Sequence, residues 1–254
     1  MRKKIERLDT PWGRAYIIGE GENIQFMPSV TTVLSLVPSN YLEEIRANIG
    51  DEQLKIISER AALRGTAMHK FLENFIICLR KTDDKEKCLY YTQRKSTDEL
   101  LNDLEKKSID TGRTLFYNIY HAGFFDDVKK VLLSEGFLYS EINLFAGTTD
   151  FAFADFRNKI VIVDFKSASS MRSDEVIHKY EIQGGAYSIA FEENYKRPVS
   201  KIEIWISFSD GTQRIVLEGE KLEERKQEFL YYCKKYHEMW PKDKILEFYK
   251  QKQT

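Results

Sequence analysis

The stretch NKIVIVDFKSAS constrains the fold more than any other part of the sequence, because a run of β-branched residues is followed at once by an acid and a base. Residues 160–163 (IVIV) predict a strand buried inside the protein, since all four side chains are apolar. If the strand continues through Asp164 and Lys166, alternation places these two side chains on one face, about 6–7 Å apart along the strand. We therefore expect a buried strand that ends in ionisable groups.

A hairpin before this strand brings a second acid to the same place. If the chain turns through residues 156–158, with Asn158 in a left-handed conformation, Asp150 lies opposite Asp164 with the side chains about 5 Å apart. Carboxylates this close repel each other unless a proton or a cation lies between them. Their oxygens favour Mg²⁺ or Mn²⁺, and Lys166 can stabilise charge on a phosphate or orient an attacking water. A buried ion pair with a surface acid at the strand end is the alternative interpretation.

A second motif, RGTAMHKFLENF, lies in a helix predicted over residues 51–79. Its apolar stripe consists of Met68, Leu72, Phe75 and Leu79. His69 borders this stripe, with Glu73 one turn further along the same side. Arg64 and Gly65 directly before it supply a cation and close access to the backbone. His69 is interpreted either as a metal ligand or as a structural residue of the helix.

A third motif, YEIQGGAYSIA, lies in a helix predicted over residues 173–193. Gln183 and Tyr187 are spaced i, i+4, so an amide and a phenol project from the same side. Gly184 and Gly185 inside a helix cost about 1–2 kcal/mol relative to alanine. We expect either the sheet or a ligand backbone to approach the helix closely at this point.

Taken in order, the motifs R-G-x-x-x-H, G-x-x-D, D-x-K and Q-x-x-x-Y resemble the set found in the RecB-like branch of the PD-(D/E)XK nucleases. They extend from Arg64 to Tyr187, about half of the chain. PSVTTVLS, residues 28–35, is similar to a segment near the start of the mitochondrial genome maintenance exonuclease and its phage relatives. The resemblance implies an α/β fold with a restriction-endonuclease-like core, in which a mixed β-sheet is flanked by helices and carries a helical insertion.

The resemblance also implies a role for each matching residue. The implied metal ligands are His69, Asp150, Asp164, the backbone carbonyl of Phe165 and, through a water molecule, Glu141. The implied catalytic residues are Lys166, Asp164 and Asp150. The implied substrate-binding residues are Gln183, Tyr187, Arg64, Ser29 and Thr31. The segment before Asp150 reads GTT where other branches of the superfamily carry a proline motif.

The activity implied by this resemblance is metal-dependent hydrolysis of DNA by an exonuclease that uses Mg²⁺ or Mn²⁺ and acts on single strands or DNA ends. Two alternatives stay open: a structure-specific endonuclease of the same fold, and a non-catalytic protein that binds nucleic acid. The intact set of His69, Asp150, Asp164 and Lys166 argues against the second, because a binding module needs no paired acids. No P-loop or helicase motif occurs, so ATP-driven unwinding requires a helicase or another replication or repair protein as a partner.

Composition sets broader limits. The chain has 254 residues, 42% hydrophobic and 31% charged, which is typical of a soluble globular protein. Its net charge of −1 means that contacts with nucleic acid have to come from a local basic groove or from metal ions. Cys78, Cys88 and Cys233 are too few and too widely spaced for an iron–sulfur cluster, and they suit a reducing compartment. Without a signal-like or bilayer-length apolar segment, we expect a cytoplasmic protein (the host cytoplasm if viral), neither secreted nor membrane-bound.

We expect one nuclease domain over residues 1–254, with a helical section at about 41–135 over or beside a sheet core at about 136–218. The expected strands are residues 138–145, 150–156 and 159–166, and the expected hairpins are residues 14–18 with 23–26 around GEGE and residues 201–208 with 213–217. Helices are expected at residues 97–107, 113–134 and about 220–250, and Ser29 is expected to cap a short helix through Leu36. The aromatic residues at 116–125 are read either as a platform for stacking bases or as a core helix face.

Overall fold

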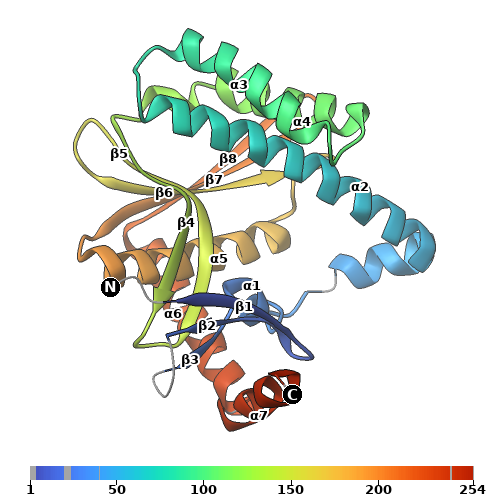
Figure 1. The fold of residues 1–254 in the computed structure, drawn as a ribbon, viewed down its shortest axis with the longest axis vertical. Helices are drawn as coiled ribbons and strands as arrows, with labels where there is room; N and C mark the ends of the chain where they lie inside the picture. The colour runs from blue at the N-terminus through green and yellow to red at the C-terminus, as the bar shows by residue number, and fades with distance from the viewer. Residues whose placement is uncertain (1–3, 20–23, 40, 241, 254) are drawn as a thin grey trace.

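The structure is a computed structural model that describes residues 4–19, 24–39, 41–240 and 242–253. Its main feature is a five-stranded sheet in the order β4-β5-β6-β7-β8 (Figure 1). The strands are β4 (Lys130–Ser140), β5 (Phe145–Ala154), β6 (Ile160–Ser167), β7 (Val199–Phe208) and β8 (Gly211–Glu218). Since β6 and β7 are parallel and the other neighbours are antiparallel, the sheet is mixed.

The central strand β6 is the predicted apolar strand, and Ile160, Val161, Ile162 and Val163 are all buried. Helix α5 (Asp174–Tyr195) connects β6 to β7, as a parallel pair requires a crossover connection. The connection to α5 begins directly after Asp164 and Lys166, because β6 ends at Ser167. Helix α5 therefore lies beside the end of β6 that carries these two residues.

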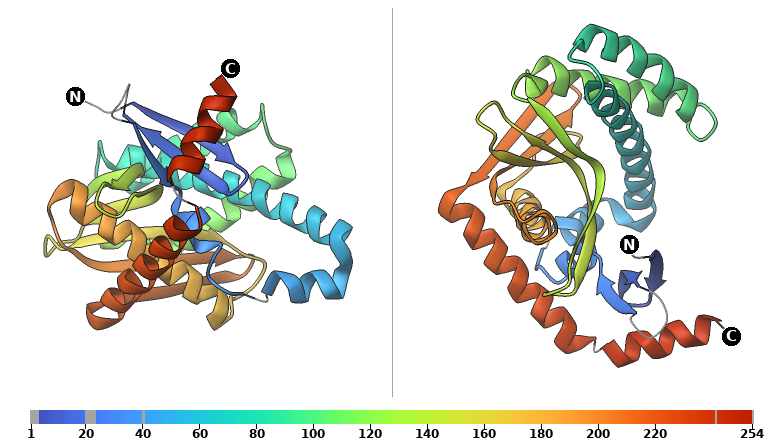
Figure 2. Two further views of the ribbon diagram at one scale, coloured as in Figure 1. Left: turned by 90° about the horizontal axis from the view of Figure 1, so that it is seen from below. Right: turned by 60° about the vertical axis from the view of Figure 1, so that its left-hand side comes forward.

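Helices cover both faces of the sheet (Figure 2). One face packs against α1 (Val30–Leu34), α5 and α6 (Gly219–Met239). The other packs against α2 (Tyr41–Leu79), α3 (Lys85–Leu100) and α4 (Lys106–His121) through a phenylalanine-rich cluster, and the short 3₁₀ helix η2 (Phe124–Asp126) belongs to the same cluster. Helix α2 is interrupted at Gly50, whose φ of 78° is a left-handed value that glycine adopts without strain.

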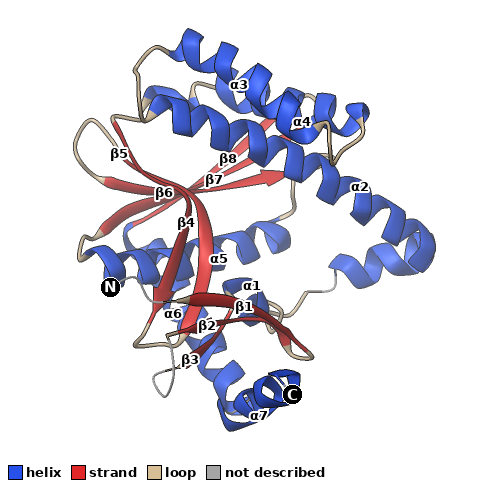
Figure 3. Cartoon of the chain, viewed as in Figure 1, coloured by secondary structure: helices blue, strands red, loops and turns tan. Residues whose placement is uncertain are grey.

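A second, three-stranded sheet lies at one end of the molecule (Figure 3). It consists of β1 (Ile5–Thr10), β2 (Gly13–Ile18) and β3 (Gln25–Pro28), and it packs against α7 (Lys242–Gln253). A parallel bridge from Ser29 to Ala146 joins the end of β3 to β5. This bridge brings the N-terminal segment to the start of the strand that carries Asp150.

The hairpin between β5 and β6 has the predicted register. Ala154 pairs with Ile160 and Phe151 pairs with Val163, and Asn158 has a φ of 58°. Continued by one residue beyond the last pair, this register places Asp150 opposite Asp164. The hairpin of β7 and β8 is also confirmed.

Three expected elements are wrong in type or extent. Residues 141–144 form a turn, so the strand expected at 138–145 ends at Ser140. The strand also begins earlier than expected, because β4 starts at Lys130. The helix expected at 113–134 ends at His121, and the one expected at 97–107 is divided between α3 and α4. The segment KVLLS at the start of β4 is a short apolar run, and such a run does not distinguish helix from strand by its period.

The ends of the chain agree with the sequence in part. β2 and β3 form the expected N-terminal hairpin, while its turn falls on residues 20–23, outside the described residues. Ser29 caps α1 as expected, whereas β1 was not predicted. The expected C-terminal helix is two helices, because α6 ends at Met239.

Phe116, Phe124 and Phe125 are buried in the core, which favours the core interpretation of the aromatic segment. Among the described residues, no helix combines the length and apolarity needed to cross a bilayer.

Candidate active site

Strands β5 and β6 separate at the point where the predicted acids begin. Backbone pairing extends to Phe151 and Val163, and beyond it the carboxylate of Asp150 takes over as the acceptor. The N–H of Phe165 donates a 2.7 Å hydrogen bond to Oδ2 of Asp150. Because the N–H and C=O of one strand residue point to the same edge, the carbonyl of Phe165 also faces the side where Asp150 lies. This geometry suits the role predicted for that carbonyl.

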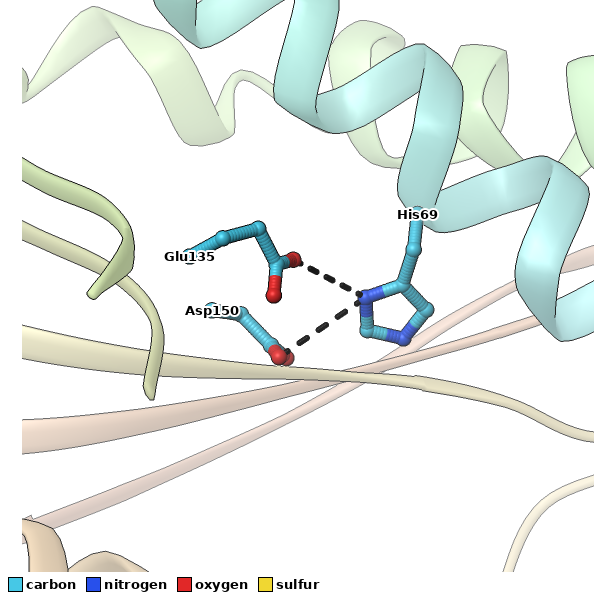
Figure 4. A group of neighbouring side chains, drawn as sticks. All are labelled: His69, Glu135 and Asp150. Carbon is cyan, nitrogen blue, oxygen red and sulfur yellow. Dashed lines mark ion pairs between the residues drawn. The ribbon is translucent and has the colours of Figure 1, made fainter. Parts of the chain in front are cut away.

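Three potential metal ligands converge from α2, β4 and β5 (Figure 4). Nδ1 of His69 lies 3.7 Å from Oδ1 of Asp150 and 3.9 Å from Oε1 of Glu135. One ligand atom of each residue lies within 4.8 Å of the corresponding atoms of the other two. An imidazole nitrogen with carboxylate oxygens is a donor set that Mg²⁺ or Mn²⁺ accepts, so the residues present fit a hard divalent cation.

Glu135 is the ligand candidate that the sequence reasoning missed. Ser134 pairs with Phe151 and Gly136 with Thr149, so Glu135 lies opposite Asp150 in the ladder. Its φ of 47° is unusual for a residue with a side chain. The pairing of β4 with β5 also has an irregularity shortly before Glu135, between Val131 and Leu133. Glu135 could have been predicted from the strand register, because a strand that begins at residue 130 and pairs with β5 places Glu135 opposite Asp150.

Glu141, the residue expected to bind metal through water, does not belong to this group. It is exposed in the turn after Ser140, and its backbone N–H donates to Oε1 of Glu193 at 2.7 Å. It follows Glu135 by six positions, most of them in a strand that rises about 3.3 Å per residue, which amounts to roughly 20 Å. Glu141 follows the C-terminal end of β4, whereas Glu135 lies inside this strand. The expected strand at 138–145 began too late in the chain to include Glu135.

The charges of His69, Asp150 and Glu135 oppose one another, although Glu135 is exposed and the other two are half-buried. Burial alone would lower the pKa of His69, but the negative charges of Asp150 and Glu135 outweigh this effect and raise that pKa to about 9. Burial raises the pKa of Asp150, and the cations of His69 and Lys166 oppose that rise. The imidazolium therefore occupies the electrostatic position that a bound cation would take.

A chain of polar contacts joins β6 to α5 beside this group. Nζ of Lys166 lies 2.7 Å from Oδ2 of Asp164 and donates to Oε1 of Gln183 at 3.0 Å. Nε2 of Gln183 in turn donates to the hydroxyl oxygen of Tyr187 at 3.1 Å. Asp164, Lys166, Gln183 and Tyr187 thus form one continuous chain of contacts.

Burial and the paired charges set the protonation of this chain. Burial raises the pKa of Asp164 to about 6, although Lys166 opposes the rise. Burial would lower the pKa of Lys166, but Asp164 and Asp150 outweigh it, so the pKa of the ammonium group is raised. Burial also raises the pKa of Tyr187, which keeps its phenol neutral. Lys166 is therefore a cation at neutral pH and can stabilise negative charge.

Two glycines fix how closely α5 approaches its neighbours. A Cβ on Gly184 would lie 2.6 Å from Cγ2 of Ile202 on β7, and one on Gly185 would lie 2.8 Å from the backbone of Arg225 on α6. The glycines are therefore explained by packing between the sheet and α6. This close packing holds Gln183 at the depth at which it meets Lys166.

The remaining predicted site residues are Arg64 on α2, Ser29 at the N-cap of α1 and Thr31 on α1. A Cβ on Gly65 would lie 3.1 Å from Oγ of Ser167, so the backbone of α2 beside Arg64 lies against the end of β6. Ser29 is buried and accepts a 3.0 Å hydrogen bond from the N–H of Thr32, which is the cap of α1. Thr31, by contrast, is exposed on α1.

A family model described as the PD-(D/E)XK nuclease superfamily matches residues 40–247. Among solved structures, a Eubacterium rectale protein provisionally designated an exonuclease aligns with a TM-score of 0.45 and 12% identity, covering 67% of this chain and 63% of its own. The protein SSO0001 aligns with a TM-score of 0.36 and 13% identity, covering 61% of this chain and 71% of its own. The chain thus spans less than two thirds of the Eubacterium rectale protein, and no curated protein matches it.

Proposed function

Because this chain belongs to the PD-(D/E)XK nuclease superfamily, we propose that it is a metal-dependent DNA exonuclease of the RecB-like branch that acts on single strands or DNA ends. The observation that carries the proposal is the combination of two adjacent sets of residues. His69, Glu135 and Asp150 offer a donor set for a divalent cation, and the chain from Asp164 to Tyr187 presents a half-buried ammonium group next to it. A protein that only bound nucleic acid would need neither set.

In this proposal His69, Glu135, Asp150 and Asp164 hold Mg²⁺ or Mn²⁺, together with the carbonyl of Phe165. When bound, such a cation supplies Lewis acidity and makes water a stronger nucleophile at neutral pH.

The other proposed roles in binding and cleavage belong to side chains of this chain. The ammonium group of Lys166 stabilises negative charge that develops on the phosphoryl oxygens. Gln183 orients Lys166 through its 3.0 Å contact, and Tyr187 in turn orients Gln183 through the 3.1 Å contact. Arg64, Ser29 and Thr31 are proposed as further substrate contacts.

The preference for an end or a single strand is supported by the similarity of PSVTTVLS to the start of the mitochondrial genome maintenance exonuclease and its phage relatives. The chain itself carries no ATP-binding motif, so a helicase or another replication or repair protein would have to supply single strands from a duplex.

Incubation with labelled DNA in Mg²⁺ tests the proposal. An exonuclease requires a free end, so linear single-stranded DNA should be degraded to short products while the same sequence closed into a circle survives. Labels at the 5′ and 3′ ends then report the direction of digestion. Rapid nicking of the circle would establish the endonuclease alternative instead, and failure to cut any DNA would favour the non-catalytic one. A Lys166→Ala preparation purified in the same way controls for contaminating nuclease.

A further inference from the structure

A cavity of about 670 Å³ opens between α2 and α4, next to the end of β6. Its lining includes Arg64 of α2, Lys106 and Lys107 of α4, and Ala168 and Ser169 directly after β6. Three residues of extended chain span at most about 11 Å, so Ser169 lies within that distance of Lys166. The cavity is therefore adjacent to the candidate active site and separate from the metal ligands.

The lining carries an excess of positive charge. Arg64, Lys106 and Lys107 are cationic, and none of them forms an ion pair with another residue of the described segments. The acid of this lining, Asp110, already pairs with Arg113 at 3.1 Å. In a chain whose net charge is −1, such a local excess indicates an anionic ligand.

Arg64 is half-buried, and one of its N–H donors is unsatisfied. Its Nε is shielded from solvent and has no hydrogen-bond partner within the described part of the chain. Burial and the positive charge of Arg172 lower the pKa of Arg64. A shielded N–H without an acceptor costs free energy, so the side chain of Arg64 is incompletely satisfied beside this cavity.

We propose that this cavity binds a phosphate group of the nucleic-acid strand next to the phosphodiester that is cut. Phosphate is the anion class favoured by a guanidinium beside lysines, and in a nuclease the groups that flank the cut bond are phosphates. The choice of ligand rests on the proposed function, whereas the site rests on the cavity and its charge. Either a terminal phosphate or an internal phosphodiester has the required chemistry.

The test is the salt dependence of single-stranded DNA binding, measured by fluorescence anisotropy in Ca²⁺ with Lys106→Gln/Lys107→Gln. Each cation that neutralises a phosphate of a single strand contributes about 0.7 to the slope of log K against log salt. The double variant should therefore lose about 1.4 from the magnitude of this slope. Lys106 and Lys107 are exposed, so the variant should fold normally. Lys235→Gln, an equally exposed position on α6 outside this cavity, should keep the wild-type slope.

Oligonucleotides with a 5′-phosphate, a 3′-phosphate or only hydroxyl ends identify the source of the phosphate. A loss confined to one phosphorylated end supports a terminal phosphate, and an equal loss with all three supports an internal one. A double variant that keeps the wild-type slope with every oligonucleotide overturns the proposal. Cleavage by the wild type in Mg²⁺ is scored separately, so failure of the proposed function is distinguished from failure of this site.

Discussion

The N–H of Phe165 donates a 2.7 Å hydrogen bond to the carboxylate of Asp150, in the place where the backbone ladder between β5 and β6 would otherwise continue. Asp150 therefore has two functions that can be separated. Its oxygen satisfies a backbone donor between two strands, and its charge contributes to the proposed metal site. Substitutions at this position can remove one function without the other.

Asp150→Asn keeps an oxygen for Phe165 but removes the charge. Since burial raises the pKa of Asp150, the neutral side chain should leave the metal-free protein as stable as wild type or slightly more so. Asp150→Ala, which leaves the N–H of Phe165 without its partner, should lower the free energy of unfolding by about 1–3 kcal/mol. Thermal melts should also show that Mn²⁺ stabilises wild type and neither variant. Stabilisation of Asp150→Asn by Mn²⁺ would contradict the assignment.

Glu135 and Glu141 form a matched pair for testing the metal group. Glu135→Gln should weaken Mn²⁺ binding and lower Mg²⁺-dependent cleavage, because it removes one of three converging ligands. Glu141→Gln makes the same chemical change in an exposed turn and should leave both properties at the wild-type level. Titration of the melting temperature with Mn²⁺ measures the first effect directly. Equal losses in both variants would show that general charge, and not ligation, is responsible.

Lys166→Ala tests the catalytic cation. Cleavage in Mg²⁺ should fall by about 10²–10³-fold or more, because the ammonium group stabilises charge that develops in the transition state. Binding of single-stranded DNA in Ca²⁺ should change little. Lys235→Ala serves as a control for the loss of one positive charge. Substantial residual cleavage by Lys166→Ala would favour the interpretation of Asp164 and Lys166 as a structural ion pair.

Glu203 gives a prediction about pH that is independent of the candidate metal site. Burial would raise the pKa of Glu203, but hydrogen bonds from Arg214, Lys201 and Trp205 outweigh it and lower that pKa. A lowered pKa means that the stabilisation is fully present above the unfolded-state pKa of about 4.3 and is lost as the pH falls through the folded-state value.

At pH 7 the free energy of unfolding of Glu203→Gln should therefore be about 1.5–3 kcal/mol lower than that of wild type. This difference in free energy should become smaller as the pH falls from about 5 toward 3. Urea denaturation at several pH values measures this difference. Glu224→Gln, on an exposed position of α6, should show no comparable pH dependence relative to wild type. A constant difference for Glu203→Gln across this range would contradict the ionic interpretation.

The sequence by itself determined the parts of the protein that depend on neighbouring residues. The apolar run at 160–163 predicted β6, the turn at Asn158 predicted the register that brings Asp150 opposite Asp164, and the i, i+4 spacing predicted the pairing of Gln183 with Tyr187. These relations are set by strand alternation, turn geometry and helix periodicity.

Tertiary structure alone decided which distant segments complete the site. The start of β4 is a strand because it pairs with β5, and only this pairing makes Glu135, and not Glu141, the neighbour of Asp150. His69 reaches the same point because α2 packs across the sheet, where a Cβ on Gly112 of α4 would lie 2.4 Å from Cβ of Ala67. Short apolar segments have no strong preference of their own, so their structure and their partners are chosen by the surface that they bury.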